Sequence, residues 1–165
     1  LLYTTVLFVV GAAIICGVSL VFYGAEGAAL PIQNYALISP YSLTMVQACA
    51  MFIGIFYLIT IGMVAFTLAL SACLSSTLAI IVTDVAILFV SGMLPTGGSG
   101  LLDHIFTMFP MGNIQSPFVV FAELFSYPLG PIVIDLIGMA ALVYCTLMVV
   151  GVPVAWLAWS RHQVA

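Results

Sequence analysis

Four long apolar stretches, separated by segments rich in Gly, Pro and Ser, dominate the pattern of hydrophobic and polar positions in this chain. A helix rises 1.5 Å per residue and the hydrocarbon core of a bilayer is about 30 Å thick, so roughly 20 apolar residues suffice to cross it. Backbone groups in hydrocarbon must satisfy their own hydrogen bonds, which favours helices and excludes an open sheet. We therefore predict an all-α membrane bundle with four transmembrane helices, over about residues 1–23, 43–73, 77–94 and 131–159.

The connections between these spans differ in character. Residues 24–42 contain several Gly, Pro and Asn residues and are predicted to form an irregular loop. Residues 71–76 are mostly small and are predicted to form a tight turn between the second and third spans. These two segments would lie at opposite ends of the bundle.

The longest connection, residues 95–130, is not simply polar. After a Gly-rich break, residues 101–109 place apolar side chains on one helical face and polar side chains on the other. The polar face consists of Asp103, His104 and Thr107. A second apolar piece covers residues 118–125. Both pieces are too short to cross a bilayer, so we predict short re-entrant or interfacial helices before the last span.

The orientation of the bundle depends on very few residues. An even number of spans puts both termini on one side of the membrane, and Arg161 is the only Lys or Arg in the sequence. Because basic residues accumulate on the cytoplasmic side, we expect a cytoplasmic C-terminus in the cell membrane. Trp156 and Trp159 fit an interfacial aromatic belt at the same end. Residues 24–42 and 95–130 would then face outward.

Composition supports the membrane assignment and excludes other classes. Hydrophobic residues make up 65% of the chain and charged residues 4%, whereas charged residues make up about 25% of a soluble domain. A soluble globular protein is therefore excluded, and the lipid bilayer is the expected surrounding. With one basic residue, the chain has no patch for nucleic acid. The chain begins Leu-Leu-Tyr without Met, so we expect it to be part of a longer protein.

The residue types that form metal, redox or catalytic sites in other proteins do not occur here in the spacings typical of such sites. The cysteines form no CxxC or Cys/His cluster, and His104 and His162 have no HxxxH spacing, so neither metal nor redox chemistry is indicated. The cysteines are Cys16, Cys49, Cys73 and Cys145. A nucleophile–base pair, a Gly-rich phosphate loop and a Walker motif are all missing from the sequence. We therefore predict no catalytic, cofactor or metal site, and the chain is not expected to be an enzyme.

Asp84 is the most unusual residue, because it lies near the middle of the third predicted span. A charge at that depth costs at least about 2.5 kcal/mol. Asp84 is either a proton or substrate site facing the bundle interior, or a structural carboxyl that is protonated or bonded to a neighbouring helix. Thr83 and Ser91 are its expected local partners. Asp135, about one turn inside the last predicted helix, is favoured there by the helix dipole and interpreted as a second intramembrane polar residue with a structural role.

Pairs of small residues four positions apart favour close helix packing in lipid. These pairs are Ala13 with Gly17, Ala50 with Gly54, Ser71 with Ser75, Ala72 with Ser76, and Gly151 with Ala155. Such pairs are common in any membrane helix, so they are candidates for packing contacts only. Pro153 removes one backbone hydrogen bond and is expected to kink the last helix near its end.

Four local features, taken in order, resemble the type 2 ABC transporter permease family, the membrane subunits of exporters for drugs, antibiotics, lipids and polysaccharides. Together they cover most of the chain from about residue 24 onward. They are Pro40-Tyr41-Ser42-Leu43-Thr44 before the second span, the break at Ser71-Ala72-Cys73-Leu74-Ser75-Ser76, the run ending Met93-Leu94-Pro95 with a short helix ending Phe109-Pro110, and the tail Arg161-His162-Gln163-Val164.

This resemblance implies the C-terminal four-helix portion of a six-helix permease. The family's first two spans and its cytoplasmic coupling segment would be missing. It also implies two kinds of partner: ABC ATPase subunits, which bind the ATP, and a second permease copy that completes a homo- or heterodimer with the path along its interface. The third span is apolar and small throughout in the family, so Asp84 departs from the pattern.

Three functions remain open on the sequence. The leading one is a permease subunit of an ABC exporter, moving an amphipathic or hydrophobic substrate by alternating access. The second is an ion- or proton-coupled carrier in which Asp84 titrates. The third is a structural subunit of a larger membrane complex, whose assembly would depend on Ala13, Gly17 and Gly54.

Overall fold

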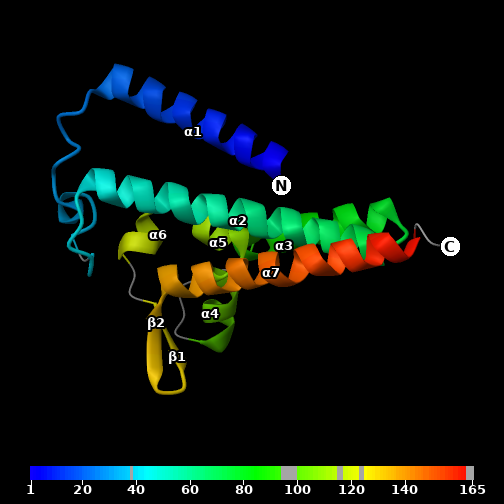
Figure 1. The fold of residues 1–165 in the computed structure, drawn as a ribbon. Coiled ribbons are helices and arrows are strands. Elements are labelled where there is room, and N and C mark those ends of the chain that lie inside the picture. Colours follow the sequence, from blue (N-terminus) through cyan, green and yellow to red (C-terminus); the bar gives the residue numbers. More distant parts are fainter. Residues whose placement is uncertain (38, 94–99, 115–116, 123–124, 163–165) are drawn as a thin grey trace.

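The computed structural model describes residues 1–37, 39–93, 100–114, 117–122 and 125–162. Helices dominate the described chain, and a short β-hairpin precedes the last helix (Figure 1). The elements are α1 (Leu2–Tyr23), the 3-10 turn η1 (Ile32–Asn34), α2 (Met45–Cys73), α3 (Thr77–Met93), α4 (Leu101–Thr107), α5 (Pro110–Ile114), α6 (Pro117–Ala122), β1 (Ser126–Leu129), β2 (Ile132–Asp135) and α7 (Leu136–His162).

Three helices are long and apolar enough to cross a membrane: α1, α2 and α7 over Leu136–Ser160. By the length and composition of its helices, the chain therefore fits the expected multi-pass helical membrane protein. The fourth predicted span, α3, has 17 residues, which rise roughly 26 Å against a hydrocarbon core of about 30 Å. The predicted count of four crossings is not confirmed, and residues 94–99, just after α3, lie outside the described part of the chain.

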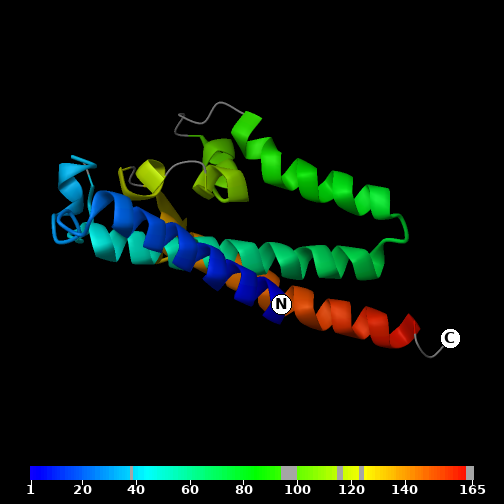
Figure 2. The ribbon, with the colours of Figure 1, turned by 90° about the horizontal axis from the view of Figure 1, so that it is seen from above.

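The long helices run side by side. Figure 2 shows α3 running back along α2 after the turn at residues 74–76, and Figure 1 shows α7 following α2 in the same direction. The loop after α1, the short helices and the hairpin lie at one end of the bundle; the 74–76 turn and the end of α7 lie at the other. The sequence predicted the same grouping of segments at the two ends. Which end faces which side of the membrane stays a prediction.

The most extensive helix contact is between α2 and α7, and two glycines allow it. A Cβ atom added at Gly62 would lie 2.8 Å from Cδ1 of Tyr144, and one at Gly151 would lie 2.9 Å from the backbone oxygen of Ala65. Ordinary contacts of this kind begin near 3.4 Å. The two helices are therefore so close that a side chain at either position would force them or a neighbouring side chain to shift.

The buried core lies at the loop end of the bundle, where α2 and α7 meet the short elements. Its residues are Ile32, Ala48, Ile55, Ile59, Val120, Phe121, Tyr127, Leu136, Ala140 and Tyr144. The helix α2 begins there with a capping box: the Thr44 hydroxyl accepts from the Gln47 N–H, and the Gln47 side chain accepts from the Thr44 N–H. The loop is fixed to this helix start by a β-bridge between Pro31 and Thr44.

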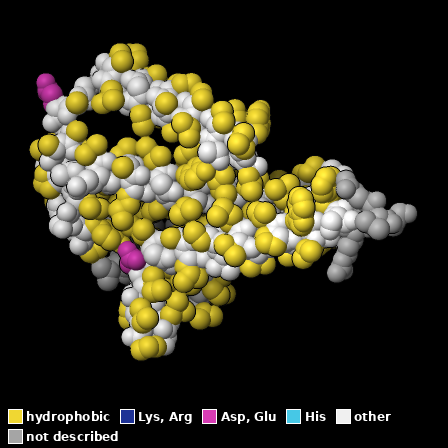
Figure 3. Space-filling model, viewed as in Figure 1, with side chains coloured by type: hydrophobic (Ala, Val, Ile, Leu, Met, Phe, Trp, Pro, Cys, Tyr) yellow, Lys and Arg dark blue, Asp and Glu magenta, His cyan; other side chains and the backbone are white. Residues whose placement is uncertain are grey.

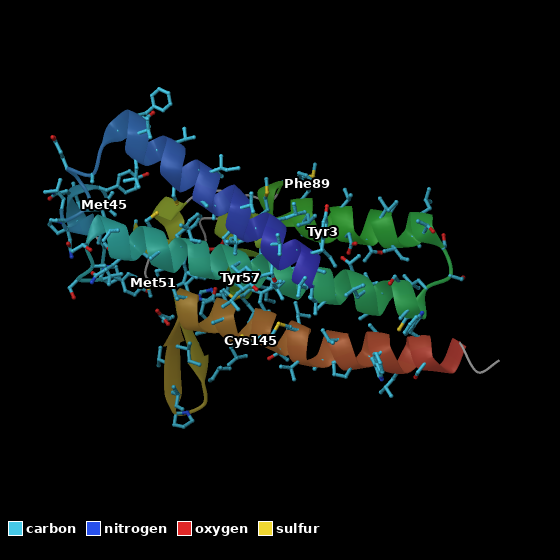
Figure 4. The ribbon with its side chains drawn as sticks, turned by 45° about the horizontal axis from the view of Figure 1, so that its top comes forward. Tyr3, Met45, Met51, Tyr57, Phe89 and Cys145 are labelled. Atoms are coloured by element: carbon cyan, nitrogen blue, oxygen red, sulfur yellow. The ribbon has the colours of Figure 1, made fainter. Side chains whose placement is uncertain are left out.

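By contrast, α1 makes few contacts with the rest of the described chain. Thr5 shares a 3.0 Å hydrogen bond with the Tyr57 hydroxyl, and the ring of Phe8 lies 5.5 Å from that of Phe56. None of the α1 residues is buried. Figure 4 shows Tyr57 on α2 where α1 approaches, and the space-filling view in Figure 3 shows α1 diverging from the bundle toward the loop, with hydrophobic side chains on its surface.

The last helix begins at Leu136, not near Pro131, because residues 126–135 form an antiparallel hairpin. Ser126 pairs with Asp135 and Leu129 with Ile132. Gly130, with φ of 63°, supplies the left-handed conformation that a tight hairpin turn needs. The β-branched run Ile132–Ile134 suits a strand as well as a helix, so the apolar pattern alone did not mark this boundary.

The short helices also differ from their predicted bounds. The expected single helix over residues 101–109 ends at Thr107, and Pro110 begins α5 instead of ending a helix. Proline suits the first turn of a helix, since its missing N–H would have no partner there. The expected helix over residues 118–125 is α6, which ends at Ala122, and residues 123–124 lie outside the described part.

Candidate functional site

An apolar cavity of about 650 Å³ lies beside α7, between the long helices and the short elements. Ligand sites commonly measure about 300–1,000 Å³ and are mostly apolar with a few polar groups. Its walls come from α2, α3, α4, α5, the hairpin and α7: Met63, Ile87, Leu101, His104, Ile105, Met108, Phe109, Pro110, Tyr127, Pro128, Leu129, Met139, Val143, Tyr144 and Leu147. Three flexible Met side chains among the lining residues suit an apolar ligand of adaptable shape.

Two tyrosines hold the short helices against this cavity. The Tyr144 hydroxyl of α7 donates to the Met108 carbonyl at 2.8 Å, and the Tyr127 hydroxyl of β1 donates to the His104 carbonyl at 3.2 Å. Burial, and then the nearby Asp103 charge, raise the pKa of Tyr127 to about 12. The Tyr127 phenol therefore stays protonated and donating at neutral pH.

The polar face of α4 turns toward the rest of the chain, and part of its apolar face turns outward. Asp103 and Thr107 are buried, whereas Leu101 and Leu102 are 79% and 65% exposed. The Thr107 hydroxyl donates to the Asp103 carbonyl at 2.6 Å. An apolar face turned outward is favourable where the surroundings are lipid, so the polar face turns inward. The sequence placed Asp103 on the polar face of this helix, and the structure shows that this face meets the rest of the chain.

Asp84 bonds to a neighbouring helix, as one of its two sequence-based interpretations required. The Thr67 hydroxyl of α2 lies 2.9 Å from its Oδ2, while Oδ1 is buried and has no hydrogen-bond partner among the described residues. Its expected partners were different: the Thr83 hydroxyl donates to the Ala79 carbonyl, and the Ser91 side chain lies outside the described part. Thr67 was missed because it is 17 positions away in sequence.

Asp135 lies at the start of α7, not inside it. Its Oδ1 accepts the Gly138 N–H at 3.0 Å, and its Oδ2 accepts the Tyr41 hydroxyl at 2.7 Å. Burial and the Asp135 carboxylate raise the pKa of Tyr41 above its usual value. Asp135 therefore caps α7 and fixes the loop to it, which agrees with the expected structural role at a helix N-terminus.

The residues predicted to pack helices closely are exposed within this chain. They are Ala13, Gly17, Ala50, Gly54, Ser71 and Ser75. A Cβ atom at Gly17 or Gly54 would meet nothing within 4 Å. The close contacts instead involve Gly62, which the small-residue pairs did not include, and Gly151, which they did. Contacts of the first group with another chain stay a prediction.

The far end of the bundle contains a second hollow of about 710 Å³, between the ends of α2 and α7. Trp156 and Trp159 line it with Ser71 and Ser75, and the two indole rings lie 6.4 Å apart. Both tryptophans are more than half exposed. Arg161 follows them in the last turn of α7. Their predicted role as interfacial anchors at this end stays a prediction.

Comparison with known proteins gives no further assignment: no family model, no curated protein and no solved structure matches this chain. Any proposal for its function therefore has to start from the fold, the cavity and the Asp84–Thr67 contact.

Proposed function

We propose that this chain is a permease subunit of an ABC exporter, in which it moves an amphipathic or hydrophobic substrate across the cell membrane by alternating access. The observation that carries the proposal is the apolar cavity bounded by α2, α3, α7 and the short elements. A transport path needs such a site between elements that can move relative to one another. The order of spans, tight turn, short helices and last helix supports the same family.

The energy for transport would come from partners. The sequence has no Walker motif, so ATP would bind to ABC ATPase subunits on the cytoplasmic side, where we place the 74–76 turn and the C-terminus. A second permease copy would complete the path along the dimer interface. The exposed small residues Gly17 and Gly54 are available for such a contact, because no described residue covers them.

The test is ATP-dependent efflux from vesicles that contain the full-length protein and its ATPase partner. We expect efflux of a hydrophobic probe that requires ATP and disappears when the ATPase is omitted. Co-purification without any ATPase subunit, or efflux that ignores ATP, would contradict the proposal.

One observation favours a second candidate function, an ion- or proton-coupled carrier. Oδ1 of Asp84 is buried without a hydrogen-bond partner among the described residues. Such an atom costs free energy, and an ionisable residue inside a membrane span often marks a proton or ion pathway. The carrier would show pH-dependent flux that is independent of ATP and is abolished by Asp84→Asn. If the chain is an exporter subunit, transport would require ATP both in the unchanged protein and in Asp84→Asn.

A further inference from the structure

We infer that the apolar cavity and Asp84 together form a binding site for an amphipathic organic cation. The inference rests on the proposed function, since it names the class of substrate for the same cavity. It is argued from the hydrogen bonds of Asp84, the charges around it and its position relative to the cavity walls.

The first step concerns the single proton of the Thr67 hydroxyl. The Thr67 Oγ1 lies 2.9 Å from Oδ2 of Asp84 and 3.0 Å from the Met63 carbonyl oxygen, and a hydroxyl has one hydrogen to donate. The Asp84 carboxylate therefore receives at most one hydrogen bond from the described residues, shared with a competing acceptor. Its buried Oδ1 receives none of them. An ionised carboxylate in such a place needs a cationic partner.

The second step is that the described helices packed on α3 contain no Lys or Arg. The helices packed on α3 are α2, α4 and α5; α2 and α5 contain no Asp, Glu, His, Lys or Arg, and α4 contributes Asp103 and His104. Arg161 is the only Lys or Arg in the sequence, and it follows Leu147, the last cavity residue of α7, by roughly 20 Å of helix rise. Apart from His104, which lines the cavity, a cation for Asp84 would have to come from a ligand.

The third step connects Asp84 to the cavity. Met63 and Ile87 belong to the cavity wall; Thr67 lies four residues after Met63 on α2, and Asp84 three residues before Ile87 on α3. Residues three or four apart share one helix face. Since α2 and α3 are antiparallel, Thr67 and Asp84 both lie roughly 5 Å beyond the wall, toward the 74–76 turn. Neither residue lines the cavity itself, but each lies about one helical turn from a residue that does.

These positions select a ligand by charge and polarity. The Met-rich, aromatic walls suit the apolar part of a ligand. Asp84, beyond the wall toward the 74–76 turn, would attract a positive charge on that ligand. An anion of the same shape would be repelled by Asp84, and a neutral molecule would gain nothing from it. A protonated amine or another hydrophobic monovalent cation fits both requirements.

The experiment compares two ions of equal shape and opposite charge, tetraphenylphosphonium and tetraphenylborate, by equilibrium dialysis with the chain in phosphatidylcholine nanodiscs. Empty nanodiscs give the lipid contribution, which is subtracted. We expect saturable phosphonium binding that is at least tenfold weaker in Asp84→Asn. Ile105→Trp, a bulky change at a half-exposed position of the cavity wall, should also weaken it.

Asp135→Asn is the matched control, because it removes the same charge at the start of α7 and keeps an Asn cap. It should bind phosphonium like the unchanged chain. Equal phosphonium binding by Asp84→Asn, equal binding of borate, or an equal loss in Asp135→Asn would overturn the inference. Each variant is used only if its far-UV circular dichroism and thermal unfolding match those of the unchanged chain. Where Asp84→Asn fails that check, Asp84→Glu replaces it, and the expected outcome is retained phosphonium binding; its loss in a folded Asp84→Glu would also overturn the inference.

This binding experiment needs neither ATP nor a partner, so it separates the two proposals. Binding without ATP-dependent efflux would leave the cation site standing and contradict the exporter. ATP-dependent efflux without charge-selective binding would support the exporter and contradict the cation site.

Discussion

Gly62→Ala tests whether the close contact between α2 and α7 supports the fold. The new Cβ atom would lie 2.8 Å from Cδ1, 3.1 Å from Cβ and 3.1 Å from the backbone oxygen of Tyr144. The Tyr144 ring cannot simply turn away, because its hydroxyl donates to the Met108 carbonyl at 2.8 Å. The helices must therefore separate, or that hydrogen bond must lengthen.

The expected cost follows from two opposing effects. Bringing the 2.8 Å contact to an ordinary 3.4 Å requires a shift of 0.6 Å (3.4 minus 2.8) in a packed interface. Overpacking of this kind costs about 1–3 kcal/mol, while replacing a helical Gly by Ala returns up to about 1 kcal/mol. Taking about 2 kcal/mol, the middle of the overpacking range, less about 1 kcal/mol, we expect a net destabilisation of about 1 kcal/mol.

Gly54→Ala is the matched control, since Gly54 lies in the same helix and a Cβ atom there meets nothing within 4 Å. It should be neutral or stabilising by up to about 1 kcal/mol. Both variants are unfolded by titrating sodium dodecyl sulfate into mild-detergent micelles. The fluorescence of Trp156 and Trp159 reports the separation of α2 and α7, because both residues line the hollow between them. An unfolding midpoint for Gly62→Ala at or above that of Gly54→Ala would refute the reasoning.

Three further predictions concern the ends of the bundle. Asp135→Ala removes the cap on the Gly138 N–H and the acceptor of Tyr41, so it should destabilise the chain by about 1–2 kcal/mol in the same titration, with Asp135→Asn closer to the original. The pKa of Tyr127 is about 12 in the fold against 10 unfolded, so its stabilisation is complete below pH 10 and falls as pH rises toward 12; melting curves should show a smaller loss at high pH for Tyr127→Phe, and an equal loss would contradict the assignment. With the other cysteines replaced by Ala, exposed Cys73 should react with a membrane-impermeant maleimide only after cells are permeabilised; labelling of intact cells would reverse the proposed orientation.

The long helices were predictable because their signal is strong and local. Residues 1–23 and 43–73 were expected, and α1 and α2 span Leu2–Tyr23 and Met45–Cys73. Apolar runs of this length have few alternatives in lipid. Residues 132–135 are too short a run to have a single possible structure, because a short apolar run fits a strand or the first turn of a helix. Only the neighbouring Gly130 indicated a turn.

The candidate site was predictable only in part, because its residues meet through the fold. Asp84 was recognisable by its charge within an apolar span, but Thr67 was not, since the pairing depends on how α2 and α3 align. The inward turn of Asp103 was equally hidden, because periodicity identifies two faces of a helix without saying which one meets the chain. Gly62 gave no pair signal and emerged only from its contact with Tyr144.

The walls of the cavity are held with unequal strength, and this bears on how the site would open. On one side α2 and α7 are in contact along their length, with Gly62 and Gly151 allowing their backbones to approach closely. On the other side α3 has far less contact with α2, and the hydrogen bond between Thr67 and Asp84 joins them. Regions with few buried contacts open at lower free energy than the packed core. A cation that takes Asp84 would weaken this bond, so ligand binding would act directly on the wall that is easiest to move.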